Sequence, residues 1–301
     1  MITRLAMSLL ATVAFANGSL AQEWKAKIKE IRFAVSSSEN SNDAIARYEP
    51  FGTYLSTRIG VPVKVFRTPD YAAQIEALNA GQVEFARIGP ANYALGYKVM
   101  GKRIEPLLID VDLNDSRGYF SILAVREDSP YKSIMDLKGK SIIYADPNST
   151  SGYAFPLYFM KKEGYDPATF FSKAIFSGGH ENSVLALLQG TGEAAATFWT
   201  NEERGNIQRM VEKKMIPAGK TRIIWTSPII PNGPWVARAD LPAELKSAFV
   251  DAVTKMPADG KDAWQAITGG QVKAVVPVTH EDYLDVIAVT LANEADRKKT
   301  N

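Results

Sequence analysis

The sequence predicts an α/β protein with two lobes and a ligand cleft between them. Runs typical of strands and helices alternate at the spacing of βαβ units from residue 30 to residue 111. A second alternating unit of different texture begins near Ser116. The chain has 301 residues, of which 46% are hydrophobic, so it can bury the core of one large or two medium domains.

The first α/β unit is predicted from apolar runs separated by glycine and proline. The helix before residue 60 ends at Gly60-Val61-Pro62, and Gly89-Pro90 breaks the third strand. This alternation indicates a parallel sheet with helices on its faces. The predicted strands are 30–35, 63–66, 83–88 and 104–111, and the predicted helices are 41–59, 71–80 and 91–100.

The second unit is predicted to be inserted into the first. Its predicted strands are 119–125, 141–144, 173–176, 193–198, 222–225 and 235–238, and its predicted helices are 134–139, 153–162, 182–188 and 206–214. Residues 242–291 are predicted to be mainly helical. We therefore expect lobe 1 to comprise residues 22–115 and 239–301, and lobe 2 to comprise residues 116–238.

Residues 1–21 have the pattern of a secretory signal peptide. Arg4 supplies the positive start, residues 5–15 form a short apolar stretch, and Ser19-Leu20-Ala21 is a small-x-small cleavage site. No later run reaches the roughly 20 apolar residues that a transmembrane helix needs. No cysteine follows the cleavage site to take a lipid anchor. We expect a soluble protein exported to a periplasm.

The composition argues against several function classes. The formal net charge is only +2, and no long basic run is present, so nucleic acid is not an expected partner. The absence of Cys excludes disulfides and thiolate chemistry, and two His residues make a zinc site improbable. The G-x-S-x-G, Walker and HExxH patterns are absent. We expect no cofactor, no metal and no catalytic apparatus.

Residues 146–153 (DPNSTSGY) stand between a predicted strand and a predicted helix. Pro147 and Asn148 fit a turn, and Gly152 lets the backbone approach a ligand closely. The hydroxyls of residues 149–151 then lie where the first N–H groups of a helix are unpaired. One interpretation is an ordinary Ser/Thr N-cap. The other is a site for an oxyanion, phosphate-like above all, formed by Ser149, Thr150 and Ser151.

Other polar side chains follow predicted strands at the same edge of each sheet. Such loops converge on the cleft between two lobes. Tyr71 and Tyr93 offer phenolic hydroxyls, or else bury their rings against helices. His180 follows two glycines at a helix start, where an imidazole can donate to an oxyanion, although a lone His is commonly structural. Thr200 lies in the loop after strand 193–198.

Five further residues are expected to be structural. Arg87 lies beside the cleft, and we expect it to form a salt bridge rather than to bind an anion. Trp199 and Trp235 could wall the pocket, but core packing is the default for tryptophan. Asp146 is predicted to be a turn residue, because a carboxylate would repel a bound phosphate group. His280 is predicted to lie on the surface.

The chain resembles the periplasmic substrate-binding proteins of phosphate, phosphite and phosphonate ABC transporters. The resemblance rests on residues 68–72 (TPDYA), 146–152 (DPNSTSG), 179–182 (GHEN) and 224–231 (IWTSPIIP), in the order and spacing of that family. It implies the bilobed type II periplasmic-binding-protein fold. It also implies that Ser149, Thr150, Ser151, Tyr71 and His180 hold the oxygens of the ligand.

The sequence departs from the family at the positions that bind an amine. By resemblance, members that bind aminoalkylphosphonates use two carboxylates. One lies in a turn that is Pro231-Asn232-Gly233-Pro234 here, and the other position holds Thr200, with Glu202 and Glu203 nearby. Loss of one partner of a buried ammonium costs roughly 3–5 kcal/mol. Phosphite, methylphosphonate, phosphate and a phosphonate with a different tail all remain open as ligands.

The resemblance implies a protein that captures a phosphorus oxyanion and docks, when closed, on the membrane permease of an ABC importer. A monomer suffices for such a hinge-closing protein. Two alternatives remain open. One is a sensory protein that presents the same ligand to a receptor. The other is an enzyme on the same fold, for which only His180 qualifies as a base.

Overall fold

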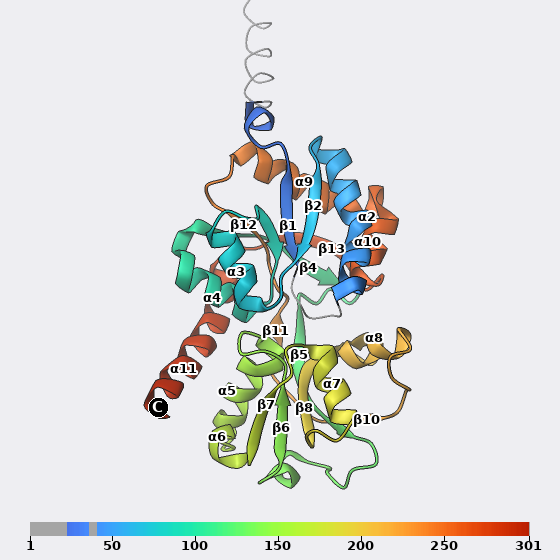
Figure 1. Cartoon of the computed structure of the whole chain (residues 1–301), viewed down its shortest axis with the longest axis vertical. Helices are drawn as coiled ribbons and strands as arrows, with labels where there is room; N and C mark the ends of the chain where they lie inside the picture. Colours follow the sequence, from blue (N-terminus) through green and yellow to red (C-terminus); the bar gives the residue numbers. More distant parts are fainter. Residues whose placement is uncertain (1–22, 36–40, 301) are drawn as a thin grey trace, which may run out of the picture.

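In the computed structural model, which describes residues 23–35 and 41–300, the chain folds into two lobes that each contain one sheet. Figure 1 shows the two lobes stacked along the long axis, with helices on the faces of both sheets. The predicted α/β class and bilobed fold are confirmed. The predicted signal peptide lies outside the described residues.

The first sheet has six strands in the order β13-β4-β12-β3-β1-β2. Strands β1, β2, β3 and β4 all run in one direction, as predicted for the first four strands, whereas β12 and β13 run antiparallel to them. The strand bounds are β1 Ile31–Val35, β2 Val63–Arg67, β3 Phe85–Arg87, β4 Ile104–Asp112, β12 Trp235–Arg238 and β13 Val272–Pro277.

Two of these strands differ from the predicted organisation. We predicted that residues 235–238 belong to the inserted lobe, but β12 pairs with β3 and β4 of the first sheet. We predicted a mainly helical C-terminal region, but β13 forms an edge strand on β4. Gly269 and Gly270, both with positive φ, end α10 directly before this strand, so the VKAVVP run carried a turn signal and β-branched residues that the prediction overlooked.

The second sheet has the order β10-β5-β8-β6-β7, with β11 paired to β5 and β9 paired to β8. Strands β6, β7 and β8 are parallel, and β5 is antiparallel to β8. The bounds are β5 Gly118–Arg126, β6 Ser141–Tyr144, β7 Lys173–Phe176, β8 Ala194–Asn201, β9 Arg204–Gly205, β10 Thr221–Thr226 and β11 Ile230–Pro231.

Helices cover the sheets largely where the apolar periodicity predicts them. In lobe 1 they are α2 Ser41–Ile59, α3 Tyr71–Asn79, α4 Pro90–Met100, α9 Ala243–Asp259 and α10 Lys261–Thr268, with the 3-10 turns η1 Gly101–Arg103 and η4 Glu281–Tyr283. In lobe 2 they are η2 Ile134–Leu137, η3 Thr150–Ala154, α5 Phe155–Lys162, α6 Pro167–Phe170, α7 His180–Leu188 and α8 Asn206–Glu212.

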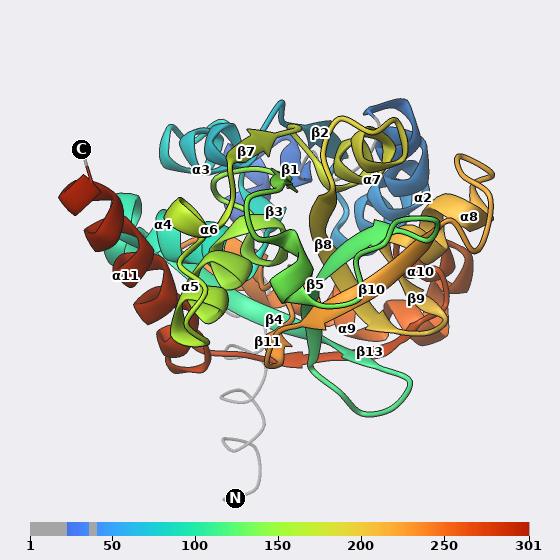
Figure 2. The same ribbon diagram turned by 90° about the horizontal axis from the view of Figure 1, so that it is seen from below.

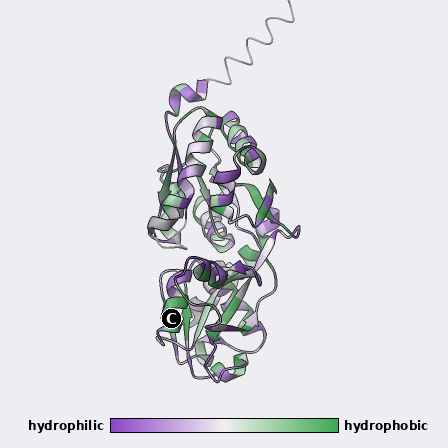
Figure 3. Ribbon diagram, turned by 90° about the vertical axis from the view of Figure 1, so that its right-hand side faces the viewer, coloured by the Kyte–Doolittle hydropathy of each residue, from purple (hydrophilic) through white to green (hydrophobic). Residues whose placement is uncertain are grey.

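Aromatic side chains fill the core beneath the first sheet. Phe33 lies 4.9 Å from Phe51 and 5.8 Å from Trp235 between ring centroids, and all three are fully buried. Burial of each such side chain contributes about 1.5–3 kcal/mol. In Figure 3 the hydrophobic colour concentrates on the strands inside each lobe and the hydrophilic colour on the outer helices. Trp235 is thus a core residue, as expected.

Two short segments, 113–117 and 232–234, carry the chain between the lobes on one side. They are hydrogen-bonded to each other, because the Asn232 N–H donates to the Arg117 carbonyl at 2.7 Å. The Asn232 side-chain amide also donates to the Asp110 carbonyl at 3.1 Å. These contacts hold the segments together as a hinge on which the lobes can rotate.

The C-terminal helix α11, Leu284–Thr300, contacts both lobes by packing on α4 and α5. Figures 1 and 2 both show it running beside these two helices. The Asn293 side chain donates to the Ala154 carbonyl at 2.8 Å. Lys98 and Lys161 form ion pairs with Glu294 and Asp296, both at 2.7 Å. The helix therefore connects the lobes on the side where it lies.

Candidate functional site

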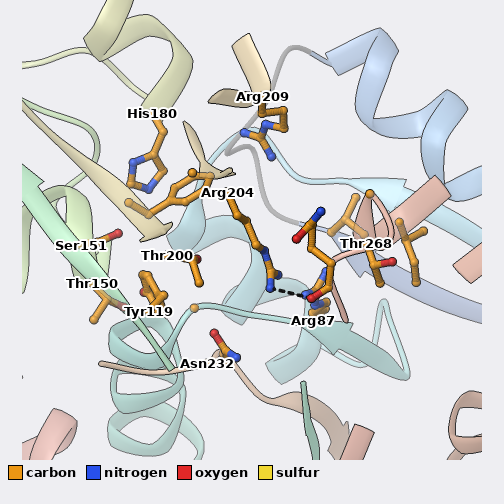
Figure 4. Close-up of a pocket in the computed structure, with 18 of the residues that line it drawn as sticks. Arg87, Tyr119, Thr150, Ser151, His180, Thr200, Arg204, Arg209, Asn232 and Thr268 are labelled. Carbon is orange, nitrogen blue, oxygen red and sulfur yellow. Dashed lines mark hydrogen bonds between the residues drawn. The ribbon is translucent and has the colours of Figure 1, made fainter. Parts of the chain in front are cut away.

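A cavity of about 320 Å³ lies between the two lobes. It is lined from lobe 1 by residues at the end of β1 and on α2, by the residues that follow β2 and β3 and by the loop after α10, and from lobe 2 by the loops after β6, β7 and β8. Figure 4 shows Thr150, Ser151, Tyr119 and His180 on one side of it and Arg87 and Thr268 on the other. The predicted convergence of strand-end loops is therefore confirmed.

The loop after β6 forms one wall of the cavity. Ser149 is the N-cap of η3, a wide π-type turn at residues 150–154 that precedes α5. The predicted helix from residue 153 thus begins with a wider turn than expected. Ser149, Thr150 and Ser151 are all buried, with at most 3% of their surface exposed, and all three line the cavity.

The oxygens of two of these hydroxyls each accept a hydrogen bond from a backbone N–H group. The Ser149 Oγ accepts the Gly152 N–H at 3.0 Å. The Thr150 Oγ1 accepts the Ala91 N–H of α4, across the interlobe boundary, at 2.8 Å. A hydroxyl whose oxygen already accepts can still donate its proton. Ser149 and Thr150 are therefore prepared to donate to an acceptor in the cavity.

Two tyrosines add phenolic hydroxyls to the same place. Tyr71, at the start of α3, interacts with the Ser149 hydroxyl, and burial raises its pKa. Tyr119 interacts with the hydroxyls of Thr150 and Ser151, and burial raises its pKa to about 12. Both phenols stay protonated at neutral pH and serve as neutral donors.

His180, the first residue of α7, is buried against the Ser149 loop. Its Nε2 lies 3.1 Å from the Ser149 Oγ, and its Nδ1 lies 3.1 Å from the Thr197 Oγ1. Burial lowers the pKa of the imidazole to about 3, and the guanidinium of Arg209 adds to this shift. His180 is therefore neutral at physiological pH, with one donor and one acceptor nitrogen.

Asp146 and Gly152 fix the shape of the loop. The Asp146 carboxylate accepts the Asn148 N–H at 2.7 Å, which is the turn role predicted for it. A Cβ on Gly152 would lie 2.5 Å from the Ala145 Cβ and 3.0 Å from the His180 Cε1. Only glycine fits there, because the loop is packed directly against the strand end and the imidazole.

Tyr93 does not line the cavity, contrary to our prediction. It is fully buried in the core on α4, and its hydroxyl lies 3.0 Å from the Nδ1 of His280. The helix turns its ring away from the cleft toward Tyr283, with 5.0 Å between the centroids. His280, which we assigned to the surface, is half-buried by this contact.

Thr200 lines the cavity as predicted, together with Phe198 and Glu203. Trp199 points elsewhere and packs on Phe120, with 5.8 Å between the ring centroids. In the turn after β11, a Cβ on Gly233 would lie 2.0 Å from the Ile88 carbonyl oxygen. No carboxylate side chain fits at that position.

The cavity also contains arginines. Arg87 forms the predicted salt bridge with Asp110, and the other oxygen of this carboxylate accepts the Trp235 Nε1–H at 2.8 Å. Arg209 lies 3.8 Å from the Glu181 carboxylate. Arg204, in the short strand β9, donates to the carbonyl of Gln271 in the opposite lobe at 3.2 Å.

Sequence reasoning missed Tyr119 and Arg204. Tyr119 lies at the start of β5, whereas the predicted site residues follow the carboxyl ends of strands. Because β5 runs antiparallel to β8, its start lies at the same edge of the sheet as the end of β8. Strand β9 folds back on β8, so that Arg204 pairs with Asn201 and lies near Thr200.

Two kinds of feature are not found in the described ranges 23–35 and 41–300. No helix there is long and apolar enough to cross a bilayer. No group of three or more His, Cys, Asp and Glu residues is placed to hold a metal ion.

The family of the chain follows from comparison with known proteins. A family model described as "ABC transporter, phosphonate, periplasmic substrate-binding protein" matches residues 33–283. The phosphate-import protein PhnD of Mycolicibacterium smegmatis is 32% identical over 270 residues, which are 84% of this chain and 82% of the relative.

Solved structures show the same fold. A binding protein component of an ABC phosphonate transporter from Pseudomonas aeruginosa superposes with a TM-score of 0.79 at 27% identity, over 90% of this chain and 89% of the other. PhnD1 from Prochlorococcus marinus, in complex with methylphosphonate, gives 0.77 at 18% identity, over 88% and 98%. The chain belongs to the family of periplasmic substrate-binding proteins of phosphonate ABC transporters.

Proposed function

We propose that this protein binds a phosphorus oxyanion in the interlobe cavity and delivers it to the membrane permease of an ABC importer. The binding group is the hydroxyl cup, which we define as Tyr71, Tyr119, Ser149, Thr150, Ser151 and His180. The observation that carries the proposal is that N–H groups already occupy acceptor positions of Ser149 and Thr150, so both hydroxyls can donate inward. Family membership indicates that the oxyanion bound by this cup is a phosphorus compound.

The cup is built from neutral donors. Such donors replace the hydration of an anion without introducing a counter-charge that must itself be desolvated. A neutral His180 with its proton on Nε2 donates to the Ser149 oxygen and accepts from Thr197. That tautomer frees the Ser149 proton for the ligand. A ligand anion that only accepts hydrogen bonds therefore favours the His180 tautomer with its proton on Nε2.

The contact between Ser149 and His180 has the geometry of a nucleophile and its base, which raises the alternative of an enzyme. Two features oppose it. The partner on Nδ1 is the hydroxyl of Thr197 rather than a carboxylate that would stabilise an imidazolium. A pKa of about 3 also makes His180 a weak base at neutral pH. Binding without turnover is the better interpretation.

The two lobes supply the movement that import requires. The Thr150 contact with Ala91 joins the lobes beside the cavity, and segments 113–117 and 232–234 form the hinge. A ligand that bridges the cup and lobe 1 favours the closed form. We propose that this closed form docks on the permease in the periplasm, after removal of residues 1–21, and that the protein acts as a monomer without a cofactor.

Calorimetric titration of protein refolded from denaturant, which removes carried-over ligand, tests this function. The panel is methylphosphonate, phosphite, phosphate, 2-aminoethylphosphonate, sulfate and methanesulfonate. We expect at least one phosphorus compound to bind at least about tenfold more tightly than both sulfur compounds, a difference of about 1.4 kcal/mol. Preference for a sulfur oxyanion, or the absence of any phosphorus ligand, would overturn the proposal.

A further inference from the structure

The cavity extends beyond the hydroxyl cup to a second polar region. Figure 4 shows the Arg204 side chain crossing the cavity from the side of the cup toward Arg87. Asn232, Thr268 and Gln271 line the same region. A ligand whose phosphorus group sits in the cup would direct its substituent toward these side chains.

The positive charge of Arg204 has few hydrogen-bond partners and no direct ion-pair partner among the described residues. Its guanidinium donates one hydrogen bond, to the Gln271 carbonyl, and it forms no ion pair with any residue of 23–35 and 41–300. An arginine retains its charge in proteins, and it offers five N–H donors in a fork that matches a carboxylate. The described surroundings thus leave most of its donor capacity for a ligand.

The nearby carboxylates are occupied by other donors. Asp110 binds Arg87 and the Trp235 indole. Asp112 accepts the backbone N–H groups of Asn114 and Ser116 at 2.9 and 2.8 Å. Glu203 and Glu212 also line the cavity, but both are exposed to solvent, and neither pairs with Arg204. Asp110 and Asp112 therefore act on Arg204 only through space, and no acidic side chain forms a direct ion pair with it among the described residues.

We propose that Arg204 is a specificity residue that binds a carboxylate on the substituent of the ligand. The ligand class is a small compound with a phosphorus oxyanion at one end and a carboxylate one or two carbons away. This inference rests on the proposed function, because it assumes that the phosphorus group occupies the hydroxyl cup. The cavity of about 320 Å³ accommodates a compound of this size.

The same geometry disfavours an amine on the ligand. An ammonium group in this region would face Arg204, whose charge repels it, and the carboxylate of Asp110 is already bound to Arg87. The turn at Gly233 has no room for an acidic side chain. The charge of Arg204 therefore favours a carboxylated tail over an aminated one.

Titration of a pair of isosteric ligands tests the inference. Phosphonoacetate and phosphonoacetamide differ at neutral pH in the charge of the terminal group and little in size. We expect the wild type to bind phosphonoacetate about 10- to 100-fold more tightly, the range for hydrogen bonds to a charged group. In Arg204→Gln, this ratio is expected to fall below about threefold, while phosphonoacetamide affinity changes little.

Arg103→Gln is the matched control, because it removes an exposed guanidinium at the far end of β4 from the cavity and is expected to preserve the ratio. Phosphoglycolate, with the same two charged groups, distinguishes a phosphate ester from a phosphonate. Dependence on Arg204 with either compound supports the inference.

The outcomes separate this inference from the proposed function. Equal affinity of the wild type for phosphonoacetate and phosphonoacetamide would overturn the carboxylate site and leave phosphorus binding intact. Tighter binding of 2-aminoethylphosphonate than of phosphonoacetate would also overturn it. If Arg204→Gln kept the full ratio of phosphonoacetate to phosphonoacetamide affinity, Arg204 would not be the residue that binds the carboxylate. Failure of every phosphorus compound to bind would overturn both proposals.

Discussion

Replacing both Ser149 and Thr150 by alanine is expected to weaken binding of the preferred phosphorus oxyanion by about 10²- to 10⁴-fold. Each hydroxyl donates to a charged ligand, and a hydrogen bond to a charged group contributes about 1.5–3 kcal/mol. The two losses combine because the hydroxyls act on different ligand oxygens. Calorimetric titration of the double variant beside the wild type measures the effect.

A structural side effect must be separated from the binding effect. Ser149→Ala also removes the N-cap of η3, which costs about 0.5–2 kcal/mol of stability. Urea unfolding therefore accompanies each titration. Thr169→Ala with Ser172→Ala removes two exposed hydroxyls of the same lobe and is expected to leave affinity unchanged. If the Ser149 and Thr150 double variant bound within threefold of the wild type, the hydroxyl cup would be wrong.

His180 is expected to make the free protein less stable as the pH falls below 6.5. The folded state keeps the imidazole neutral down to a pKa of about 3, whereas in the unfolded chain the imidazole binds a proton near pH 6.5. The unfolded state therefore binds more protons in this window, and stability is lost as acid is added. The slope from this one group approaches about 1.4 kcal/mol for each pH unit.

Urea unfolding between pH 7.5 and about pH 4 measures this slope. His180→Asn removes the titrating group. The slope of its unfolding free energy against pH is therefore expected to be smaller than that of the wild type by up to about 1.4 kcal/mol for each pH unit, which corresponds to one bound proton. The variant with Thr169→Ala and Ser172→Ala, which keeps every titrating group of the wild type, is the control and is expected to retain the wild-type dependence. Equal slopes for the wild type and His180→Asn would show that the imidazole is not held neutral by burial.

The loop at residues 146–152 was predictable because its chemistry is local. A turn, three hydroxyls and a glycine between a strand and a helix indicate one wall of an anion site without long-range information. The packing of Gly152 on Ala145 and His180 then explains why glycine is needed there. His180 lines the cavity from the helix start at which the sequence places it, and its role in binding stays a prediction.

The rest of the site depends on contacts between distant segments. Tyr119 reaches the cavity because β5 is antiparallel to its neighbour, and Arg204 because β9 turns back on β8. Strand direction is not encoded in the apolar pattern that identifies a strand. The prediction that Tyr93 lines the cavity is wrong for a related reason. Packing against Tyr283 determines which face of α4 points toward the cleft.

The most direct test of the site is a crystal structure of the protein with methylphosphonate bound. We expect the phosphorus atom between the lobes, with its oxygens within about 2.5–3.2 Å of the hydroxyls of Ser149, Thr150 and Tyr119. We also expect the Thr150 contact with Ala91 to be retained. A ligand bound instead at the Arg204 guanidinium, with the three hydroxyls free of contact, would contradict the account.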